Sequence, residues 1–183
     1  LLEGGLDDAE HREGFVRVMR DQAVRLQALV EELLALAELE RPEATLRLER
    51  FDLRALVERQ VFAFRPAAQA EGLALELAAG ADVPVTADRV RLEQAIANLL
   101  DNAVKYTERG RVDVSVGGSD AEAWCEVRDT GPGIPGDDAA RIFERFYRVD
   151  KARSREKGGT GLGLSIVKHV AGLHGGEVSV RSV

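Results

Sequence analysis

The chain has 183 residues, of which 45% are hydrophobic and 31% are charged, and its formal net charge at pH 7 is −7. This length suffices for one domain of ordinary size plus a smaller additional segment. The negative net charge and the lack of any cluster of basic residues argue against a nucleic-acid or anionic-membrane partner. The lone cysteine, Cys125, excludes an internal disulfide and is expected to be a buried core thiol in a reducing compartment. No apolar run is long enough to cross a membrane.

The first predicted element is one long helix over residues 7 to 40, in which apolar residues recur at threes and fours and which Pro42 ends. At 1.5 Å per residue such a helix is roughly 50 Å long. Its apolar stripe has no partner of similar length in the chain. We therefore expect it to pair with another helix, either in a second subunit or in a segment preceding Leu1.

The rest of the chain alternates between strand-like and helix-like stretches. Strands are predicted over residues 46–51, 73–79, 83–86, 111–116, 123–128 and 177–183, and helices over 52–70, from 88 through 107, and over 162–174. Pro66 is expected to kink its helix or end it early, Gly117 and Gly118 to form a hairpin turn, and residues 141–148 to form a short amphipathic turn or helix. The pattern predicts an α+β fold, a two-layer sandwich in which a mixed sheet is covered by helices on one face.

One stretch of the helix that Asp88 is expected to cap has an unusual polar face: N-L-L-D-N-A-V-K-Y-T, residues 98–107. At about 100° per residue, Asn98, Asn102 and Lys105 share this face, with Tyr106 at its edge. Taken alone, such a stripe is most often a solvated helix face. The segments that follow this helix favour a functional role for its polar face instead.

Two glycine-rich segments follow: D-T-G-P-G-I-P at 129–135 and G-G-T-G-L-G-L at 158–164. Glycines let the backbone approach a planar base closely, and Asp129 at a strand end can accept a hydrogen bond from the exocyclic amine of adenine. The second segment opens a helix whose free amides and dipole can hold phosphates, and Thr160 adds a hydroxyl. The prolines of the first segment exclude a Rossmann motif, and no P-loop motif is present. The three segments together predict a nucleotide-binding site.

ATP bound at such a site needs a divalent cation, and hard cations prefer oxygen ligands. The side-chain carbonyl of Asn102 is the candidate Mg²⁺ ligand. Lys105 and an arginine of F-E-R-F-Y-R, Arg148, are the cations able to neutralise γ-phosphate charge during transfer. The sequence therefore predicts ATP and Mg²⁺ as cofactors.

These segments, with F-E-R-F-Y-R between the last two, resemble the N, G1, F and G2 boxes of sensor histidine kinases. That family belongs to an ATPase superfamily shared with gyrase, the heat-shock chaperone and mismatch-repair proteins. The resemblance covers residues 46 to 183, and the long leading helix is similar in pattern to the second helix of the family's dimerisation and phosphoacceptor hairpin. It implies that residues 1–42 belong to that hairpin and that residues 43–183 form the catalytic ATP-binding domain, with its last strand truncated.

The resemblance also implies roles for individual residues. Asn102 resembles the magnesium-ligating asparagine, Asp129 the adenine-binding aspartate, and residues 149–159 the ATP lid. The nucleotide contacts predicted from the motifs and the resemblance together are Asn98, Asn102, Lys105, Tyr106, Asp129, Gly131, Gly133, Ile134, Arg148, Gly159, Thr160, Gly161, Leu162, Gly163 and Leu164. Catalytic roles are predicted for Asn98, Lys105 and Arg148.

Asn98 bears on the reaction type. Hydrolytic members of the superfamily carry a glutamate at this position, which activates water as a general base. A carboxamide cannot take a proton, so the γ-phosphoryl group can wait for a histidine acceptor. The resemblance therefore implies a histidine kinase, from which the phosphate passes to an aspartate on the receiver domain of a response regulator.

The family's phosphoacceptor lies in an H box resembling S-H-E-L-R-T-P, and no such segment occurs in the chain. His11 lies in A-E-H-R-E-G, without that motif's carboxylate, arginine and proline at their places, and is not expected to be the acceptor. We expect the acceptor on a helix preceding Leu1. The chain is then expected to bind ATP but not to phosphorylate a histidine of its own.

Two other functions stay open at the level of sequence. One is a serine kinase of the anti-sigma type, which shares these boxes but against which the long leading helix argues. The other is a non-catalytic helical dimerisation module with a degenerate nucleotide fold. The family resemblance implies a homodimer formed through the helical hairpin, and a cytoplasmic portion of a protein that is anchored in the membrane by segments outside this chain.

Overall fold

The structure is a computed structural model that describes residues 9–39, 45–119, 121–150 and 159–182. The chain divides into two compact units, Leu1–Arg41 and Pro42–Val183. Across the residues that the structure describes, none of the helices combines the length and the apolar character needed to span a membrane.

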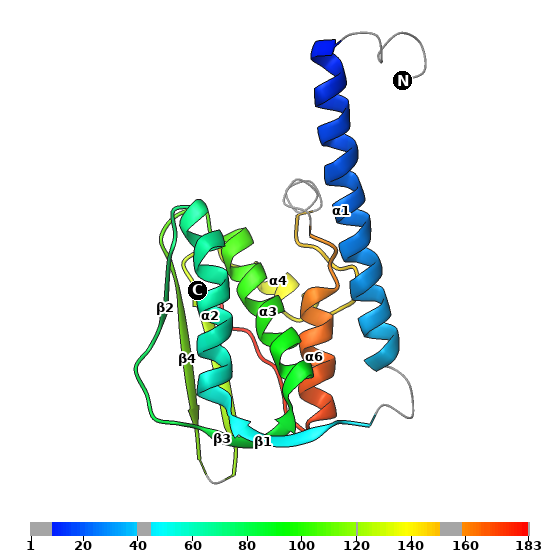
Figure 1. Ribbon diagram of the computed structural model, residues 1–183. Helices are drawn as coiled ribbons and strands as arrows, with labels where there is room; N and C mark the ends of the chain where they lie inside the picture. The colour runs from blue at the N-terminus through cyan, green and yellow to red at the C-terminus, as the bar shows by residue number, and fades with distance from the viewer. Residues whose placement is uncertain (1–8, 40–44, 120, 151–158, 183) are drawn as a thin grey trace. The chain divides into compact units, whose positions relative to one another are not determined.

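The first unit is described through one helix, α1 (Ala9–Leu39), which confirms the predicted long helix over the residues described (Figure 1). Eight of its large apolar side chains are described as exposed: Val16, Val18, Met19, Val24, Leu26, Val30, Leu33 and Leu34. Because burial of such side chains is what normally stabilises a helix of this length, α1 has the surface of a helix that packs against another one.

The described residues of the second unit form two small sheets. Strands β2 (Ala74–Leu77), β4 (Arg111–Gly118) and β5 (Ala123–Asp129) form a sheet in the order β2-β4-β5. In it β2 and β4 run parallel whereas β4 and β5 run antiparallel, so the sheet is mixed as predicted. Strands β1 (Leu48–Asp52) and β3 (Pro84–Asp88) form a separate antiparallel pair.

Three helices lie side by side in this unit: α2 (Leu53–Ala70), α3 (Arg89–Tyr106) and α6 (Gly163–Leu173) (Figure 1). Helix α3 is central, in contact with both α2 and α6, while α2 packs on β2 and β4. The predicted α+β fold, a mixed sheet covered by helices on one face, is confirmed.

The hydrophobic core lies between the helices and the larger sheet. Its side chains with almost no exposed surface are Leu56, Val57 and Val61 of α2, Leu100 of α3, and Val112 and Val114 of β4. Burying each such side chain contributes about 1.5–3 kcal/mol, so apolar contact between the layers fixes the position of α3. Cys125 of β5 is half-buried against this core, and burial raises the pKa of its thiol to about 12.

An aspartate caps α2 and ties it to the segment before β3. The Asp52 carboxylate accepts hydrogen bonds from the backbone N–H groups of Arg54 at 3.0 Å, Ala55 at 3.2 Å and Val83 at 2.8 Å. Burial by itself would raise the pKa of this carboxyl group, but the three hydrogen bonds favour the ionised form and hold the pKa below its ordinary value.

Helix α2 does not end at Pro66, contrary to one of the two outcomes expected for that proline. The helix continues to Ala70, and Pro66 lies on its exposed side. A proline removes one backbone hydrogen bond from a helix, and the buried residues on the opposite face hold this one together past the break.

The prediction that Gly117 and Gly118 form the hairpin turn is wrong. Both glycines lie within β4, and the turn follows them, where the backbone N–H of Ser119 donates to the backbone O of Glu122 at 2.7 Å. Gly117 instead lies close to a side chain on the partner strand. A Cβ there would lie 2.4 Å from the ring of Trp124, its partner on β5.

The expected last strand is absent over residues 176–182 of the described chain, which have no regular secondary structure. Alternating valines are a local pattern, whereas a strand also needs a neighbour for its backbone groups. This segment instead lies near the first glycine-rich loop, where the backbone N–H of Ile134 donates to Oγ of Ser182 at 2.7 Å. Residues 141–148, expected to be a turn or a helix, form a series of turns.

Candidate nucleotide-binding site

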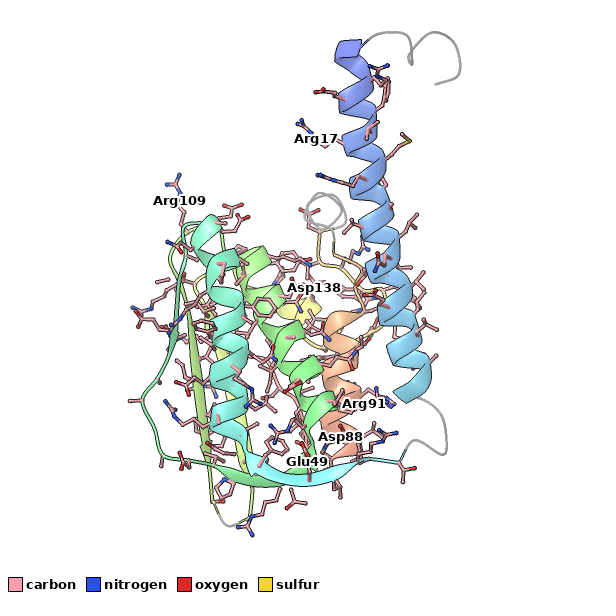
Figure 2. All side chains as sticks on the ribbon, in the orientation of Figure 1. Arg17, Glu49, Asp88, Arg91, Arg109 and Asp138 are labelled. Carbon is pink, nitrogen blue, oxygen red and sulfur yellow. The ribbon has the colours of Figure 1, made fainter. Side chains whose placement is uncertain are left out.

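Helix α3 carries the predicted polar face. The Asp88 carboxylate caps the helix, as predicted, by accepting a hydrogen bond from the backbone N–H of Arg91 at 3.1 Å; both residues lie at the start of α3 in Figure 2. Further along, Nδ2 of Asn102 donates to the backbone O of Asn98 at 2.9 Å. Within the described part of the chain nothing donates to Oδ1 of Asn102, and this oxygen can therefore serve as a ligand.

The N-terminus of α6 lies directly against these two asparagines. A Cβ on Gly163, the first residue of α6, would lie 3.5 Å from Nδ2 of Asn102 and 3.5 Å from Oδ1 of Asn98. The residue before it, Leu162, provides no side-chain cap. Because this N-cap residue does not pair with them, the first backbone N–H groups of α6, together with the helix dipole, form a position that attracts anions such as phosphate.

Asn98 contributes a buried donor. Its Nδ2 atom is buried without a hydrogen-bond partner among the described residues, and an unpaired buried donor costs about 1–3 kcal/mol. A phosphate oxygen or a water bound to a cation would satisfy it.

No group of three His, Cys, Asp or Glu side chains in the described ranges could hold a metal by itself. One asparagine oxygen beside phosphate-binding amides nevertheless fits a Mg²⁺ ion that takes its other ligands from a nucleotide and water.

The two predicted catalytic cations differ in their surroundings. Nζ of Lys105 lies 2.6 Å from Oδ2 of Asp101, one helical turn away, and both side chains are partly exposed. Arg148 is half-buried and forms neither a hydrogen bond nor an ion pair with any described residue. Lys105 is thus already held by a carboxylate, whereas the guanidinium of Arg148 has no neutralising partner in this part of the chain.

Asp129, the last residue of β5, begins the first glycine-rich loop. Its Oδ1 accepts a hydrogen bond from the backbone N–H of Gly131 at 2.8 Å, which forms an Asx turn. A Cβ on Gly131 would lie 2.7 Å from this oxygen and 3.1 Å from the backbone O of Tyr106. A side chain at 131 would crowd both oxygens, and the turn places Asp129 at the C-terminal end of α3.

The segment F-E-R-F-Y-R meets the second glycine-rich loop at Gly161. The backbone N–H of Phe146 donates to the backbone O of Gly161 at 2.9 Å. Gly161 has φ 79°, and a Cβ there would lie 2.9 Å from Cα of Phe146. Phe146 itself has φ 61°, a left-handed conformation that costs about 1–3 kcal/mol outside glycine. Phe146 and Gly161 therefore flank the expected ATP lid, of which residues 151–158 lie outside the described residues.

Sequence reasoning did not find the contacts that anchor this segment to the short helix α4 (Gly136–Ala139). The hydroxyl of Tyr147 donates to Oδ1 of Asp138, and this hydrogen bond raises the pKa of the Tyr147 hydroxyl. The guanidinium of Arg141 lies 4.2 Å from the centre of the Tyr147 ring. No local pattern signals such contacts, because the partners belong to different elements.

The remaining predicted contacts lie in the two loops, apart from Tyr106, the last residue of α3, and Leu164 in α6. Oγ1 of Thr160, a buried residue, accepts a hydrogen bond from the backbone N–H of Leu162 at 3.2 Å, so this hydroxyl shapes the loop. The side chain of Leu162 is fully buried, which leaves its backbone as the part that can meet a ligand. Gly133 has φ 75°, a conformation that favours glycine.

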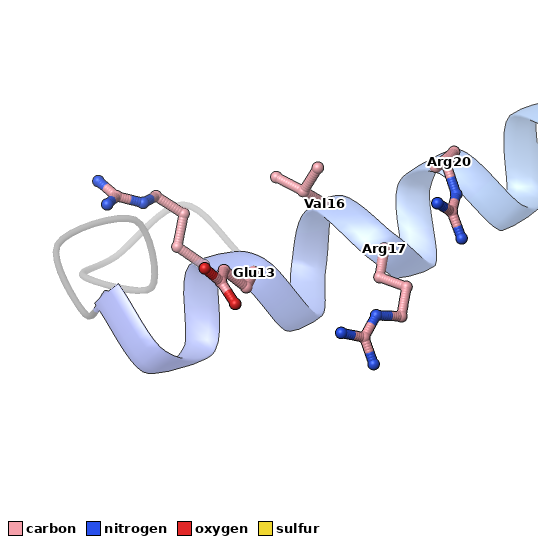
Figure 3. Close-up of a pocket in the computed structure, with 5 residues that line it drawn as sticks. Glu13, Val16, Arg17 and Arg20 are labelled. Carbon is pink, nitrogen blue, oxygen red and sulfur yellow. The ribbon is translucent and has the colours of Figure 1, made fainter.

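A separate depression lies on α1 and is lined by Arg12, Glu13, Val16, Arg17 and Arg20 (Figure 3). All five side chains come from one helix and are exposed. We interpret it as a charged, solvated helix face and not as a ligand site.

Comparison with known proteins identifies the class of the chain. Residues 87–183 match the family model described as histidine kinase-, DNA gyrase B- and HSP90-like ATPase. This match covers more than half of the chain, and the chain belongs to this ATPase family.

Within the family, the chain contains the ATP-binding catalytic domain of a sensor histidine kinase. It is 39% identical to the sensor-like histidine kinase SenX3 of Mycolicibacterium smegmatis over 99% of its length, and 32% identical to the sensor protein SrrB of Staphylococcus aureus over its whole length. It spans 47% and 31% of those two relatives. The predicted family is confirmed.

Solved structures agree with this assignment. The structure of full-length ShkA in complex with AMPPNP is similar over 96% of this chain and 37% of that one, with a TM-score of 0.78 and 32% identity. The histidine kinase AdeS of Acinetobacter baumannii is similar over 91% of this chain and 74% of that one, with a TM-score of 0.71 and 30% identity.

Proposed function

We propose that this chain is the part of a histidine kinase that binds ATP with Mg²⁺ between α3 and the start of α6, and that transfers the γ-phosphoryl group to a histidine on another helix. The observation that carries the proposal is the uncapped N-terminus of α6, whose first residue, Gly163, lies against Asn98 and Asn102. The backbone amides of α6 and the buried Nδ2 of Asn98 can donate hydrogen bonds to phosphate, and the side-chain oxygen of Asn102 can bind Mg²⁺.

Each predicted residue has a role in this proposal. Asp129 accepts a hydrogen bond from the exocyclic amine of adenine, and Oδ1 of Asn102 is the protein ligand of Mg²⁺, which neutralises phosphate charge when bound. Lys105 and Arg148 neutralise charge that develops on the γ-phosphoryl group. Asn98 can donate a hydrogen bond but cannot act as a base, which favours transfer to a protein acceptor over hydrolysis.

The proposed partners follow from α1 and from the relatives. Exposed apolar side chains along α1 support a homodimer formed through a helical hairpin that includes residues 1–42. In this proposal the acceptor histidine lies on the other helix of that hairpin, and a response regulator aspartate receives the phosphate. The domain of residues 43–183 works in the cytoplasm, where ATP is available, and segments outside this chain anchor the protein in the membrane.

Calorimetric titration with a non-hydrolysable ATP analogue, with and without Mg²⁺, tests the site. Asn102→Ala should abolish the Mg²⁺ dependence, and Asp129→Ala should weaken binding about ten-fold under both conditions. Glu122→Ala, an exposed change in the β4–β5 turn, serves as the matched control and should bind like wild type. Wild-type binding that neither site variant alters would refute the proposed residue roles.

Phosphotransfer is tested separately. Incubating the chain with ATP, Mg²⁺ and a helical hairpin that carries an intact H box should give an acid-labile phosphoprotein. An acid-stable product on serine would instead indicate the anti-sigma type of kinase, and binding without any transfer would favour a non-catalytic module.

A further inference from the structure

Thr107 has a buried hydroxyl that neither the fold nor the proposed site explains. This residue follows the end of α3 and is only 1% exposed. Its backbone N–H donates to the backbone O of Ala103 at 3.2 Å and completes the helix end. Its Oγ1, however, has no hydrogen-bond partner in the described part of the chain. Because an unpaired buried hydroxyl is unfavourable, a nearby acceptor for this hydroxyl would account for its presence.

The hydroxyl lies beside the turn that holds Asp129. Oγ1 of Thr107 lies 3.6 Å from the ideal Cβ position of Gly131, and Oδ1 of Asp129 lies 2.7 Å from the same point. Both oxygens thus border the same glycine, and a side-chain rotation or one bridging water molecule is the means by which they would be joined. The turn therefore brings a buried donor next to the carboxylate that is expected to bind adenine.

The chemistry of the two groups is complementary. A hydroxyl can donate a hydrogen bond, whereas an ionised carboxylate only accepts. Oδ1 of Asp129 already accepts from the backbone N–H of Gly131 at 2.8 Å. This one contact leaves the carboxylate free to rotate about its terminal bond, because that torsion has a broad energy minimum. A second donor from the buried side would fix the plane of the carboxylate and direct its other lone pairs toward a base.

We propose that Thr107 is a positioning residue for adenine recognition, whose hydroxyl donates to the Asp129 carboxylate, directly or through one water, and thereby orients it toward the exocyclic amine. This inference rests on the proposed nucleotide site. It assigns to the end of α3 a part in selecting the base, separate from the phosphate and metal roles of Asn98 and Asn102.

Substitution by valine separates this role from a packing role. Valine keeps the branched shape of threonine and removes the hydroxyl, so it deletes the hydrogen bond with little change of volume. If the hydroxyl only filled space, Thr107→Val would leave the fold and nucleotide binding unchanged, or make the protein more stable. A positioning role instead predicts a loss that depends on which base is offered.

The experiment measures the affinity of the 183-residue chain for ADP and for inosine diphosphate, in which a carbonyl oxygen replaces the exocyclic amine. Wild type should prefer ADP. Thr107→Val should bind ADP about ten-fold more weakly and inosine diphosphate within about two-fold of wild type, so that its preference for ADP falls. Thr107→Ser, which keeps the hydroxyl, should restore both values. Urea unfolding of each variant establishes that it is folded, and Thr107→Ala replaces the valine variant if that one does not fold.

Two results would overturn the inference. One is equal weakening of both nucleotides, which indicates a general packing role, and the other is unchanged ADP affinity in Thr107→Val. Failure of wild type to bind either nucleotide would refute the proposed nucleotide site itself, and the inference with it. The wild-type measurement therefore tells the two failures apart.

Discussion

The backbone N–H of Asp88 donates a hydrogen bond to Nε2 of His174 at 3.0 Å and so ties the start of α3 to the end of α6. Nδ1 of the same imidazole lies 2.8 Å from the backbone O of Val170. The neutral tautomer with its proton on Nδ1 satisfies both contacts. The helix that carries the asparagine pair and the helix that offers its N-terminal amides are thus joined at the end of α6 opposite Gly163.

Replacing His174 by alanine should lower the free energy of unfolding by about 1–3 kcal/mol, because the Asp88 N–H then loses its acceptor in a mostly buried position. Lys168→Ala, an exposed change on the same helix, is the control and should cost less than about 0.5 kcal/mol. Urea unfolding at pH 7 measures both. Equal stability of the two variants would show that the link between α3 and α6 contributes nothing.

Acid should destabilise the second unit through its two capping aspartates. Burial tends to raise the pKa of Asp88, but hydrogen bonds from the backbone N–H groups of Arg47 and Arg91 outweigh it, and the pKa is lowered from the ordinary value of 3.8, as it is for Asp52. A carboxyl group with a lowered pKa in the folded state stabilises the fold fully above its unfolded pKa. That contribution is lost as the pH falls through the folded pKa.

Urea unfolding between pH 7 and pH 2.5 checks this expectation. The free energy of unfolding should begin to fall near pH 4 in wild type, and less steeply in Asp52→Asn, which has one carboxyl group fewer to protonate. At pH 7 the asparagine variant should be less stable by about 1 kcal/mol, since asparagine also caps helices but carries no charge. Parallel pH curves for the two proteins would mean that Asp52 is not among the groups responsible.

Periodicity predicted the regular elements well because it is a local property. Helix α3 has a capping aspartate at its start and apolar residues at helical spacing, and the structure confirms both the cap and the helix. Asn98 and Asn102 fall on one face in the sequence and are joined by a hydrogen bond in the structure. The strands β1 to β5 also lie close to their predicted positions, with ends that differ by a few residues, whereas the strand predicted at the end of the chain is absent from the described residues.

The differences arise where a distant residue decides the local structure. Gly117 looks like a turn residue, but it lies within β4, where an added Cβ would lie 2.4 Å from the ring of Trp124 across the hairpin. The left-handed conformation of Phe146 is fixed by its hydrogen bond to Gly161, a residue on the far side of the expected lid. No periodicity reports such pairs, which is why the base of the lid could not be predicted.

Gly161→Ala should disturb the base of the lid. Its φ of 79° disfavours a side chain, and the added methyl would lie 2.9 Å from Cα of Phe146. We expect a loss of about 1–3 kcal/mol in the free energy of unfolding and weaker binding of an ATP analogue. Gly172→Ala, within α6 and with nothing near its Cβ position, is the matched control. It should stabilise the protein by about 0.5–1 kcal/mol and leave binding unchanged. Similar effects of the two substitutions would contradict this account.

Gly163→Ala should separate nucleotide binding from stability. The new methyl would lie at an ordinary contact distance of 3.5 Å from Asn98 and Asn102, in a helical position where alanine is favoured. Stability should therefore hold or rise slightly. The methyl would nevertheless occupy space beside both carboxamides, and affinity for the ATP analogue should fall about ten-fold, because overpacking by one methyl costs on the order of 1–3 kcal/mol. Unchanged affinity would place the phosphates elsewhere.

The ion pair between Lys105 and Asp101 gives the last prediction, because the two side chains can be removed separately. Nζ of Lys105 lies 2.6 Å from Oδ2 of Asp101, and both side chains are partly exposed. Such ion pairs within a helix contribute about 0.3–0.5 kcal/mol. Asp101→Asn and Lys105→Gln should therefore each change the free energy of unfolding very little. Their effects on phosphotransfer to an H-box hairpin should differ. Lys105→Gln removes a cation proposed to neutralise the γ-phosphoryl group, and the rate should fall at least about ten-fold, whereas Asp101→Asn removes a competing anion and should leave the rate equal or higher. If both variants slow transfer equally, the carboxylate positions the ammonium and the pair acts as a unit. If neither slows it, Lys105 has only a surface role, and Arg148 becomes the remaining candidate for charge neutralisation.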